Sequence, residues 1–162
     1  MKIRTLRPTF ITVAAAATFF SSAVFADDTK EVRLPLGTVQ MTKTFSSPEL
    51  TLSVDTEELT FESSYFPEVE AFSGNSFLIF LASGERDCLG RYIWATLDEA
   101  GLRASPPFGS CSDRGDVKRT AQGLMLVMPD QKSSGTVSFI LNRDGTVTEF
   151  IEDPNADSIV SQ

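Results

Sequence analysis

The stretch that decides the fold is Phe77-Leu78-Ile79-Phe80-Leu81, an unbroken apolar run between Ser76 and Ala82. Successive side chains of a β-strand point to opposite faces, so a strand formed by this run is apolar on both faces. Such a strand must be covered on both faces, which indicates a central position in a sandwich, a place beneath a loop or an oligomer interface. Two other runs have the same character, Leu124-Met125-Leu126-Val127-Met128 and Val137-Ser138-Phe139-Ile140-Leu141.

Short apolar or alternating segments between turn residues account for most of the chain after residue 30. The predicted strands are Glu31–Leu36, Thr38–Phe45, Leu50–Val54, Leu59–Ser63, Ser76–Ala82, Arg91–Leu97, Leu124–Met128, Val137–Asn142 and Val147–Ile151. No window shows helical periodicity, and Asp144-Gly145 between two apolar runs is typical of a β-hairpin. The sequence therefore predicts an all-β fold, a single antiparallel β-sandwich or barrel of about eight to ten short strands.

The first 26 residues have the pattern of a cleaved secretory signal peptide. A basic segment precedes the apolar run Ile11–Val24, and Val24-Phe25-Ala26 fits a cleavage site. The apolar run is shorter than the ~20 residues of a membrane-spanning helix, and no cysteine is present for lipid attachment at this site. We therefore expect a single β domain at residues 27–151, a flexible polar tail at residues 152–162, and a periplasmic or secreted protein without membrane insertion.

Charge and composition narrow the classes of function. Removal of residues 1–26 would take away three basic residues and no acidic residue, so the formal net charge would change from −8 to −11. This charge argues against nucleic acid, which needs a basic surface, and favours a cationic partner. The absence of histidine removes the usual base near neutral pH and the usual activator of serine or cysteine nucleophiles. We therefore expect a binding protein rather than an enzyme, with no cofactor and no metal.

Cys88 and Cys111 are the two cysteines, and an even number in an exported chain indicates a disulfide. Cys111 lies in the stretch Pro107-Phe108-Gly109-Ser110-Cys111-Ser112-Asp113-Arg114-Gly115-Asp116, which resembles a reactive loop and contains the letters RGD. Without a histidine its serines have no activator, and the Arg-Gly-Asp tripeptide is typical of an exposed turn. The disulfide therefore explains this stretch better than catalysis does.

The segment from Thr44 to Glu85 contains eight acidic residues and no lysine or arginine. Aromatic residues are interleaved with the acids, and we interpret Ser63–Glu70 as a loop that exposes both. Such a surface suits a basic protein partner, because aromatic side chains anchor and carboxylates steer; the alternative is a solvated acidic face with Phe61 and Phe72 in the core. The candidate partner-binding residues are Glu57, Glu58, Glu62, Tyr65, Phe66, Glu68 and Glu70.

Two other functions remain open at this stage. A small-ligand or glycan-binding site would use Tyr92, Trp94, Arg114, Lys118 and Arg119, since Tyr92 and Trp94 lie on the same side of one predicted strand. Two aromatic residues on one strand are also typical of a core. A carboxylate-based hydrolase would need a pair of acids, and with 22 acidic residues the spacing selects none.

The pattern Cys88-x3-Tyr92 followed by Phe108-Gly109-Ser110-Cys111-Ser112-Asp113 resembles that of small exported bacterial β domains. In size, acidity and disulfide content the chain is also similar to small acidic periplasmic proteins that neutralise lysozymes or secreted toxins. That resemblance implies a role of inhibitor or immunity type, with the partner and the oligomeric state left open.

Overall fold

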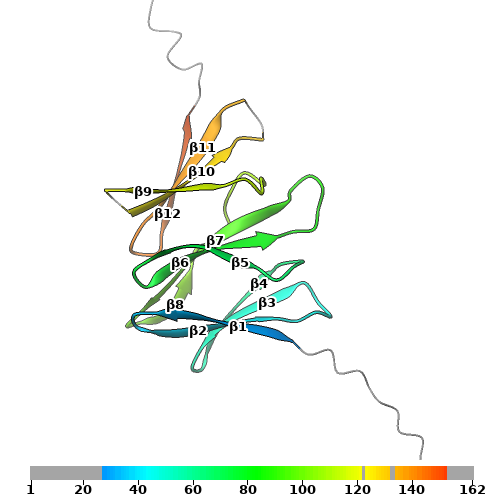
Figure 1. The fold of residues 1–162 in the computed structure, drawn as a ribbon, viewed down its shortest axis with the longest axis vertical. Coiled ribbons are helices and arrows are strands. Elements are labelled where there is room, and N and C mark those ends of the chain that lie inside the picture. Colours follow the sequence, from blue (N-terminus) through cyan, green and yellow to red (C-terminus); the bar gives the residue numbers. More distant parts are fainter. Residues whose placement is uncertain (1–26, 122, 132–133, 153–162) are drawn as a thin grey trace, which may run out of the picture.

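The computed structural model describes residues 27–121, 123–131 and 134–152, and every helix or strand in these residues is a β-strand (Figure 1). The strands are β1 (Asp28–Leu34), β2 (Gly37–Lys43), β3 (Glu49–Val54), β4 (Glu57–Glu62), β5 (Glu68–Ser73), β6 (Ser76–Ala82), β7 (Gly90–Asp98), β8 (Gly101–Ala104), β9 (Asp116–Thr120), β10 (Gly123–Pro129), β11 (Thr136–Leu141) and β12 (Val147–Glu152). The predicted signal peptide and residues 153–162 of the predicted tail lie outside the described residues, whereas Glu152, the first residue of that predicted tail, is the last residue of β12.

The strands form three antiparallel sheets of four strands each, with the strands of every sheet in chain order. Sheet A contains β1–β4, sheet B contains β5–β8 and sheet C contains β9–β12. Figure 1 shows the three sheets stacked along the long axis of the molecule, with sheet B as the middle layer. The chain passes from one sheet to the next at residues 63–67 and at residues 105–115.

The middle position of sheet B explains the unbroken apolar run in β6. Phe77, Ile79 and Leu81 pack into the core between sheets A and B. Leu78 is fully buried in a second core, between sheets B and C. Because burial of each large apolar side chain contributes ~1.5–3 kcal/mol, this strand stabilises both interfaces of the stack.

Comparison with the sequence-based expectations confirms the all-β fold and the Cys88–Cys111 disulfide. The Ser76–Ala82 strand has the predicted bounds, and the other predicted strands differ by at most three residues at either end. The predicted hairpin is also present: the Asn142 N–H donates to the Thr146 carbonyl at 2.9 Å, and Gly145 adopts a φ of 85°. Its positive φ explains the preference for glycine in this turn.

Three strands were not predicted, namely β5, β8 and β9, and each lies at the edge of its sheet. The polar strand β9 is almost entirely exposed, and β8 has only four residues, so neither shows an apolar run or a clear alternation. β5 contains a β-bulge between Val69 and Ala71, where its register with β6 shifts. The predicted loop Ser63–Glu70 is therefore wrong at its C-terminal end, where Glu68 already belongs to β5.

Candidate functional site

The alternation of β4 divides the acidic block between the two faces of sheet A. Leu59 packs against the core between sheets A and B, so Glu58 and Glu62 lie on the opposite, outer face. Glu57 lies on the core-facing side, where its Oε2 accepts the N–H of Leu102 at 2.7 Å. Glu57 therefore joins β4 to β8, and it does not share a face with its neighbour Glu58.

The outer face of sheet A is polar throughout. Its strand residues are Thr29, Glu31, Arg33, Thr38, Gln40, Thr42, Glu49, Thr51, Ser53, Glu58, Thr60 and Glu62. Four threonines are register partners across all four strands, in the order Thr29, Thr42, Thr51 and Thr60. The hydroxyls of Thr29 and Thr42 are 3.1 Å apart. This row offers both hydrogen-bond donors and acceptors on a face that buries no large apolar side chain.

Carboxylates flank the row of threonines on both sides. Glu49 and Glu62 are direct cross-strand partners on β3 and β4, and such opposition of like charges destabilises a sheet. Arg33 is the one basic residue that the described strands place on this face, and its guanidinium lies 3.3 Å from the Glu31 carboxylate. The face therefore carries an excess of negative charge, with the opposed glutamates at one end.

Two exposed aromatic side chains lie at the Glu49–Glu62 end of sheet A. Phe45 is in the β2–β3 turn and Tyr65 is in the β4–β5 connection, and they are 61% and 66% exposed. The N–H of Ser63 donates to the carbonyl of Pro48 at 2.7 Å, which ties these two segments together. We define the acidic surface as the set Phe45, Glu49, Glu58, Glu62 and Tyr65.

A buried lysine holds the turn that carries Phe45. The side chain of Lys43 points toward the core side of sheet A, and its Nζ donates to the carbonyls of Thr44 at 2.8 Å and Ser47 at 2.5 Å. A buried ammonium group needs such acceptors, because burial without hydrogen bonds is costly. Lys43 thereby ties the turn between Thr44 and Ser47, which includes Phe45, to the sheet.

The remaining members of the predicted acidic set lie elsewhere. Phe66 is half-buried against the core between sheets A and B, with the Nζ of Lys30 at 4.0 Å from its ring centroid. Glu68 and Glu70 are on β5 of sheet B, and burial together with the charge of Glu68 raises the pKa of Glu70. The predicted residues are therefore not one surface, because the chain has crossed from sheet A to sheet B between Glu62 and Glu68.

Tyr92 and Trp94 lie on the same side of β7, as predicted, but that side faces the core between sheets B and C. Tyr92 is 2% exposed and Trp94 is 1% exposed. The indole N–H of Trp94 donates to the carbonyl of Asn142 at 2.9 Å, so its one polar group is satisfied internally. As a correction to the glycan-binding alternative, neither ring has an open face on which a sugar could stack.

The basic residues of that alternative do not gather either. Lys118 and Arg119 are successive residues of β9 and so point to opposite faces of the strand. The Nζ of Lys118 lies 3.7 Å from the carboxylate of Asp116, and Arg114 is exposed in the loop before the strand. No site that combines these cations with Tyr92 or Trp94 is formed.

The Arg-Gly-Asp tripeptide has a structural explanation in the start of β9 and the close packing of Gly115. Asp116 is the first residue of β9, and Gly115 lies over the phenol of Tyr92. A Cβ at Gly115 would lie 2.7 Å from the Tyr92 hydroxyl oxygen and 2.6 Å from Cδ1 of Leu126, so a larger residue does not fit without movement. Cys111, four residues earlier, forms its disulfide with Cys88 in the β6–β7 loop.

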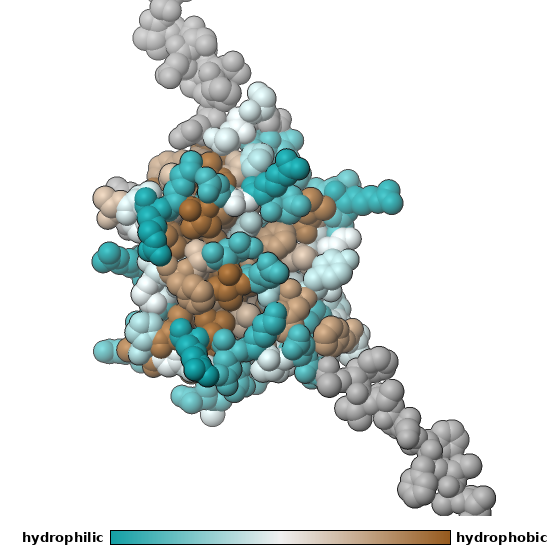
Figure 2. Space-filling view, in the orientation of Figure 1, coloured by the Kyte–Doolittle hydropathy of each residue, from teal (hydrophilic) through white to brown (hydrophobic). Residues whose placement is uncertain are grey.

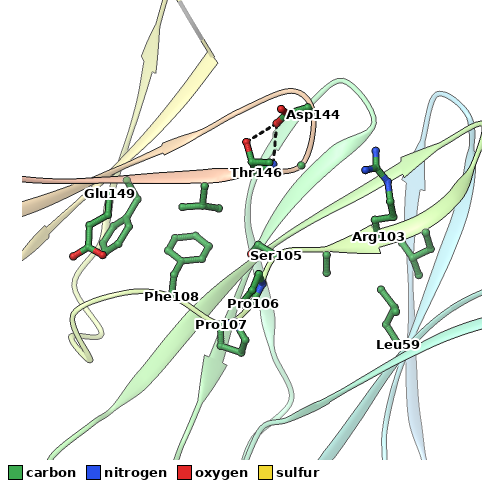
Figure 3. A pocket seen from close by; sticks show the side chains of 14 residues that line it. Leu59, Arg103, Ser105, Pro106, Pro107, Phe108, Asp144, Thr146 and Glu149 are labelled. Atoms are coloured by element: carbon green, nitrogen blue, oxygen red, sulfur yellow. Dashed lines mark hydrogen bonds between the residues drawn. The ribbon is translucent and has the colours of Figure 1, made fainter.

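A groove of about 690 Å³ follows the outer edge of β8 (Figure 3). Its floor is β8 with the segment Ser105–Phe108, one wall is Leu59 of β4, and the other is the β11–β12 turn with the first part of β12. The lining is mainly apolar, and its charged members are Arg103, Asp144 and Glu149. No sequence pattern indicated this groove, because it forms where the edges of three sheets meet.

Hydrogen bonds lower the pKa of Asp144, which lines the groove, and of Asp98, which pairs with the groove residue Arg103. The hydroxyl and the N–H of Thr146 donate to Asp144 at 2.6 and 2.9 Å, as Figure 3 shows, and they lower the pKa of Asp144. A hydrogen bond from Arg103 lowers the pKa of Asp98. Arg103 is thus paired with Asp98, and Glu149 adds a further negative charge to the wall formed by β12.

Among the described residues, no group of three or more His, Cys, Asp and Glu side chains could hold a metal ion. No helix in the same part of the chain is long and apolar enough to cross a membrane. Comparison of the chain with family models, with curated proteins and with solved structures gave no match. Function is therefore argued from the acidic surface and the groove themselves.

Proposed function

We propose that the protein is an exported interaction module whose acidic surface binds a cationic protein. The observation that carries this proposal is the opposed pair Glu49 and Glu62, with the exposed rings of Phe45 and Tyr65 at the same end of the sheet. A lysine or arginine of a partner, placed between the two carboxylates, would relieve their mutual repulsion. The aromatic rings would supply the apolar anchors that carry much of the energy of protein interfaces.

The rest of the outer face suits the same role. The row of threonines can pair with polar groups of a partner, and the net negative charge of the protein would accelerate encounter with a basic surface. The role is binding without catalysis, of the inhibitor or immunity type, in which this face occupies a basic surface of another protein.

Export is part of the proposal. The disulfide between Cys88 and Cys111 is typical of proteins in an oxidising compartment. The sequence pattern of residues 1–26 is that of a secretory signal peptide, which supports a periplasmic or secreted location.

The test is capture of partners from an envelope extract of the producing cell by the immobilised protein, at low and at high salt. We expect a basic protein to be retained at low salt and released at high salt, because exposed charge pairs are screened. The immobilised triple variant Glu49→Gln, Glu58→Gln, Glu62→Gln should no longer retain this basic protein at low salt. Its thermal unfolding midpoint should equal that of the wild type or be slightly higher.

A matched control removes three exposed carboxylates elsewhere, with Glu85→Gln, Asp87→Asn and Glu99→Gln. This variant has the same net charge as the test variant and should still capture the partner. An unchanged partner set in the test variant, or equal loss in both variants, would rule out recognition by the acidic surface.

A further inference from the structure

The outer edge of β8 has hydrogen-bonding groups that face the groove. In β7, the N–H of Leu97 donates to the carbonyl of Asn75, on the side of β6. Leu102 of β8 is the register partner of Leu97. Because the N–H of Leu97 points away from β8, the backbone N–H and C=O of Leu102 point away from β7. Ala104, two residues further on, has the same orientation. Glu57 accepts the N–H of Leu102, whereas the N–H of Ala104 and the carbonyls of Leu102 and Ala104 have no hydrogen-bond partner in the described part of the chain.

This edge is open only over a short length. Glu57 occupies one end, where its carboxylate stands in for the carbonyl of a neighbouring strand. Pro106 and Pro107 follow at the other end and supply no N–H group. The space between sheets A and C beside β8 is the groove, so an added strand would lie in the plane of sheet B, where it would continue the middle layer.

The two walls of the groove differ in chemistry. Leu59 and Leu102 belong to the core between sheets A and B, so a guest side chain directed to that wall meets an apolar surface. The wall on the side of sheet C includes Val147 together with the carboxylates of Asp144 and Glu149. Arg103 also lines the groove on this side of β8, but its charge is paired with Asp98. A basic side chain therefore suits that wall, because its apolar stem can pack on Val147 while its charge meets the carboxylates of Asp144 and Glu149.

We infer that the groove along β8 accepts an extended peptide segment of a partner protein as an added, antiparallel strand of sheet B. Since side chains of a strand alternate, the segment has alternating apolar and basic residues. The apolar residues face Leu59 and Leu102. In an antiparallel pair, two register partners have their side chains on the same face, and Ala104 faces the core between sheets A and B. The residue of the segment opposite Ala104 is therefore apolar, and it is this residue that exchanges backbone hydrogen bonds with Ala104.

This inference does not depend on the acidic surface, which lies on the outer face of sheet A. The groove lies at the edge of the stack and involves none of the residues that define the acidic surface. The two sites can therefore be tested by separate variants.

The probe is an acetylated and amidated heptapeptide of alternating lysine and valine, added to the ¹⁵N-labelled protein. We expect saturable changes in the amide resonance of Ala104 and slower exchange of its proton with solvent. N-methylation of the valines should abolish binding, because their N–H groups face β8, whereas N-methylation of the interior lysines should preserve it.

The variant Glu149→Lys reverses a charge on the groove wall and should lower the affinity for the peptide by about tenfold. The matched variant Glu58→Lys makes the same charge change on the acidic surface and should bind the peptide with an affinity close to that of the wild type. The inference is overturned if the peptide gives no saturable change at Ala104, if the valine-methylated peptide binds as well as the parent, or if both variants bind alike.

Discussion

Tyr92 places a phenol at the end of the core between sheets B and C, under Gly115. Burial raises the pKa of Tyr92 to about 12, and the nearby carboxylates of Glu70 and Asp113 add to this effect. The ring is thus a core residue whose hydroxyl must keep its proton for the native packing to persist.

This environment predicts a loss of stability in alkali. Between pH 10 and about 12 the unfolded chain releases the tyrosine proton while the folded chain retains it, so unfolding becomes more favourable as the pH rises. Below pH 10 the stabilisation by protonated Tyr92 is complete. A pKa difference of two units corresponds to roughly 2–3 kcal/mol of unfolding free energy. Urea unfolding at neutral pH and at about pH 11 should show this loss in the wild type and a smaller loss in Tyr92→Phe. Equal losses in the two proteins would contradict the assignment.

Glu57 and Glu58 are adjacent acidic residues whose different environments cannot be told apart from the sequence. Alternation along β4 sends Glu58 to the outer face and Glu57 to the N–H of Leu102 on another sheet. The alternating polar positions of Glu49–Ser53 and Glu58–Glu62 could have indicated the outer face in advance. No pattern could have shown that Glu57 has a partner 45 residues away in the chain.

At the scale of elements, the three strands that the sequence did not predict are all edge strands, whereas the edge strands β1, β4 and β12 were predicted. β5, β8 and β9 contribute few apolar residues, since an edge strand with exposed positions needs no continuous apolar pattern. Two of these strands carry features that limit association of sheet edges: the bulge and glutamates of β5, and the short length of β8 with Glu57 at one end. The polar composition of β9 and the short length of β8 weaken the strand pattern in the sequence.

The contact between β4 and β8 can be tested through Glu57. The variant Glu57→Ala leaves the N–H of Leu102 without its acceptor and should lower the free energy of unfolding by about 1–2 kcal/mol. Glu57→Gln keeps an acceptor oxygen and should recover part of this loss. The control Glu58→Ala, on the outer face, should change stability by no more than about 0.5 kcal/mol. Denaturation by urea measures all three, and a Glu57→Ala protein as stable as the control would show that the bond contributes nothing.

At the scale of the whole molecule, two cores share one sheet. Sheet B supplies apolar side chains to both of its faces, so the outer sheets depend on it for burial of their own apolar residues. Figure 2 shows one face of this stack, on which apolar groups form a broken patch with hydrophilic side chains around it. The disulfide joins the β6–β7 loop of sheet B to the connection that leads to sheet C.

Removal of this disulfide should weaken the stack without abolishing it. The double variant Cys88→Ala, Cys111→Ala opens a loop with a sequence separation of 23 residues. In the chain-entropy model it should lose about 3 kcal/mol of unfolding free energy. Reduction of the wild type should produce a similar loss, and far-ultraviolet circular dichroism should remain that of a β protein. An unchanged denaturation midpoint after full reduction would contradict a stabilising role.

The sequence by itself determined the class of fold, the central strand β6, the hairpin at Gly145 and the partnership of the two cysteines. These depend on local alternation, turn chemistry and residue type, which can be read without knowledge of neighbours in space. Only the tertiary structure decided that the stack has three layers, that Tyr92 and Trp94 are buried, and that the acidic residues divide between two sheets. The tertiary structure also decided the groove along β8, because residues of β4, β8 and β12 line it together. The physical reason is that burial and surface complementarity depend on which sheets face each other, and no short segment of the chain specifies that arrangement.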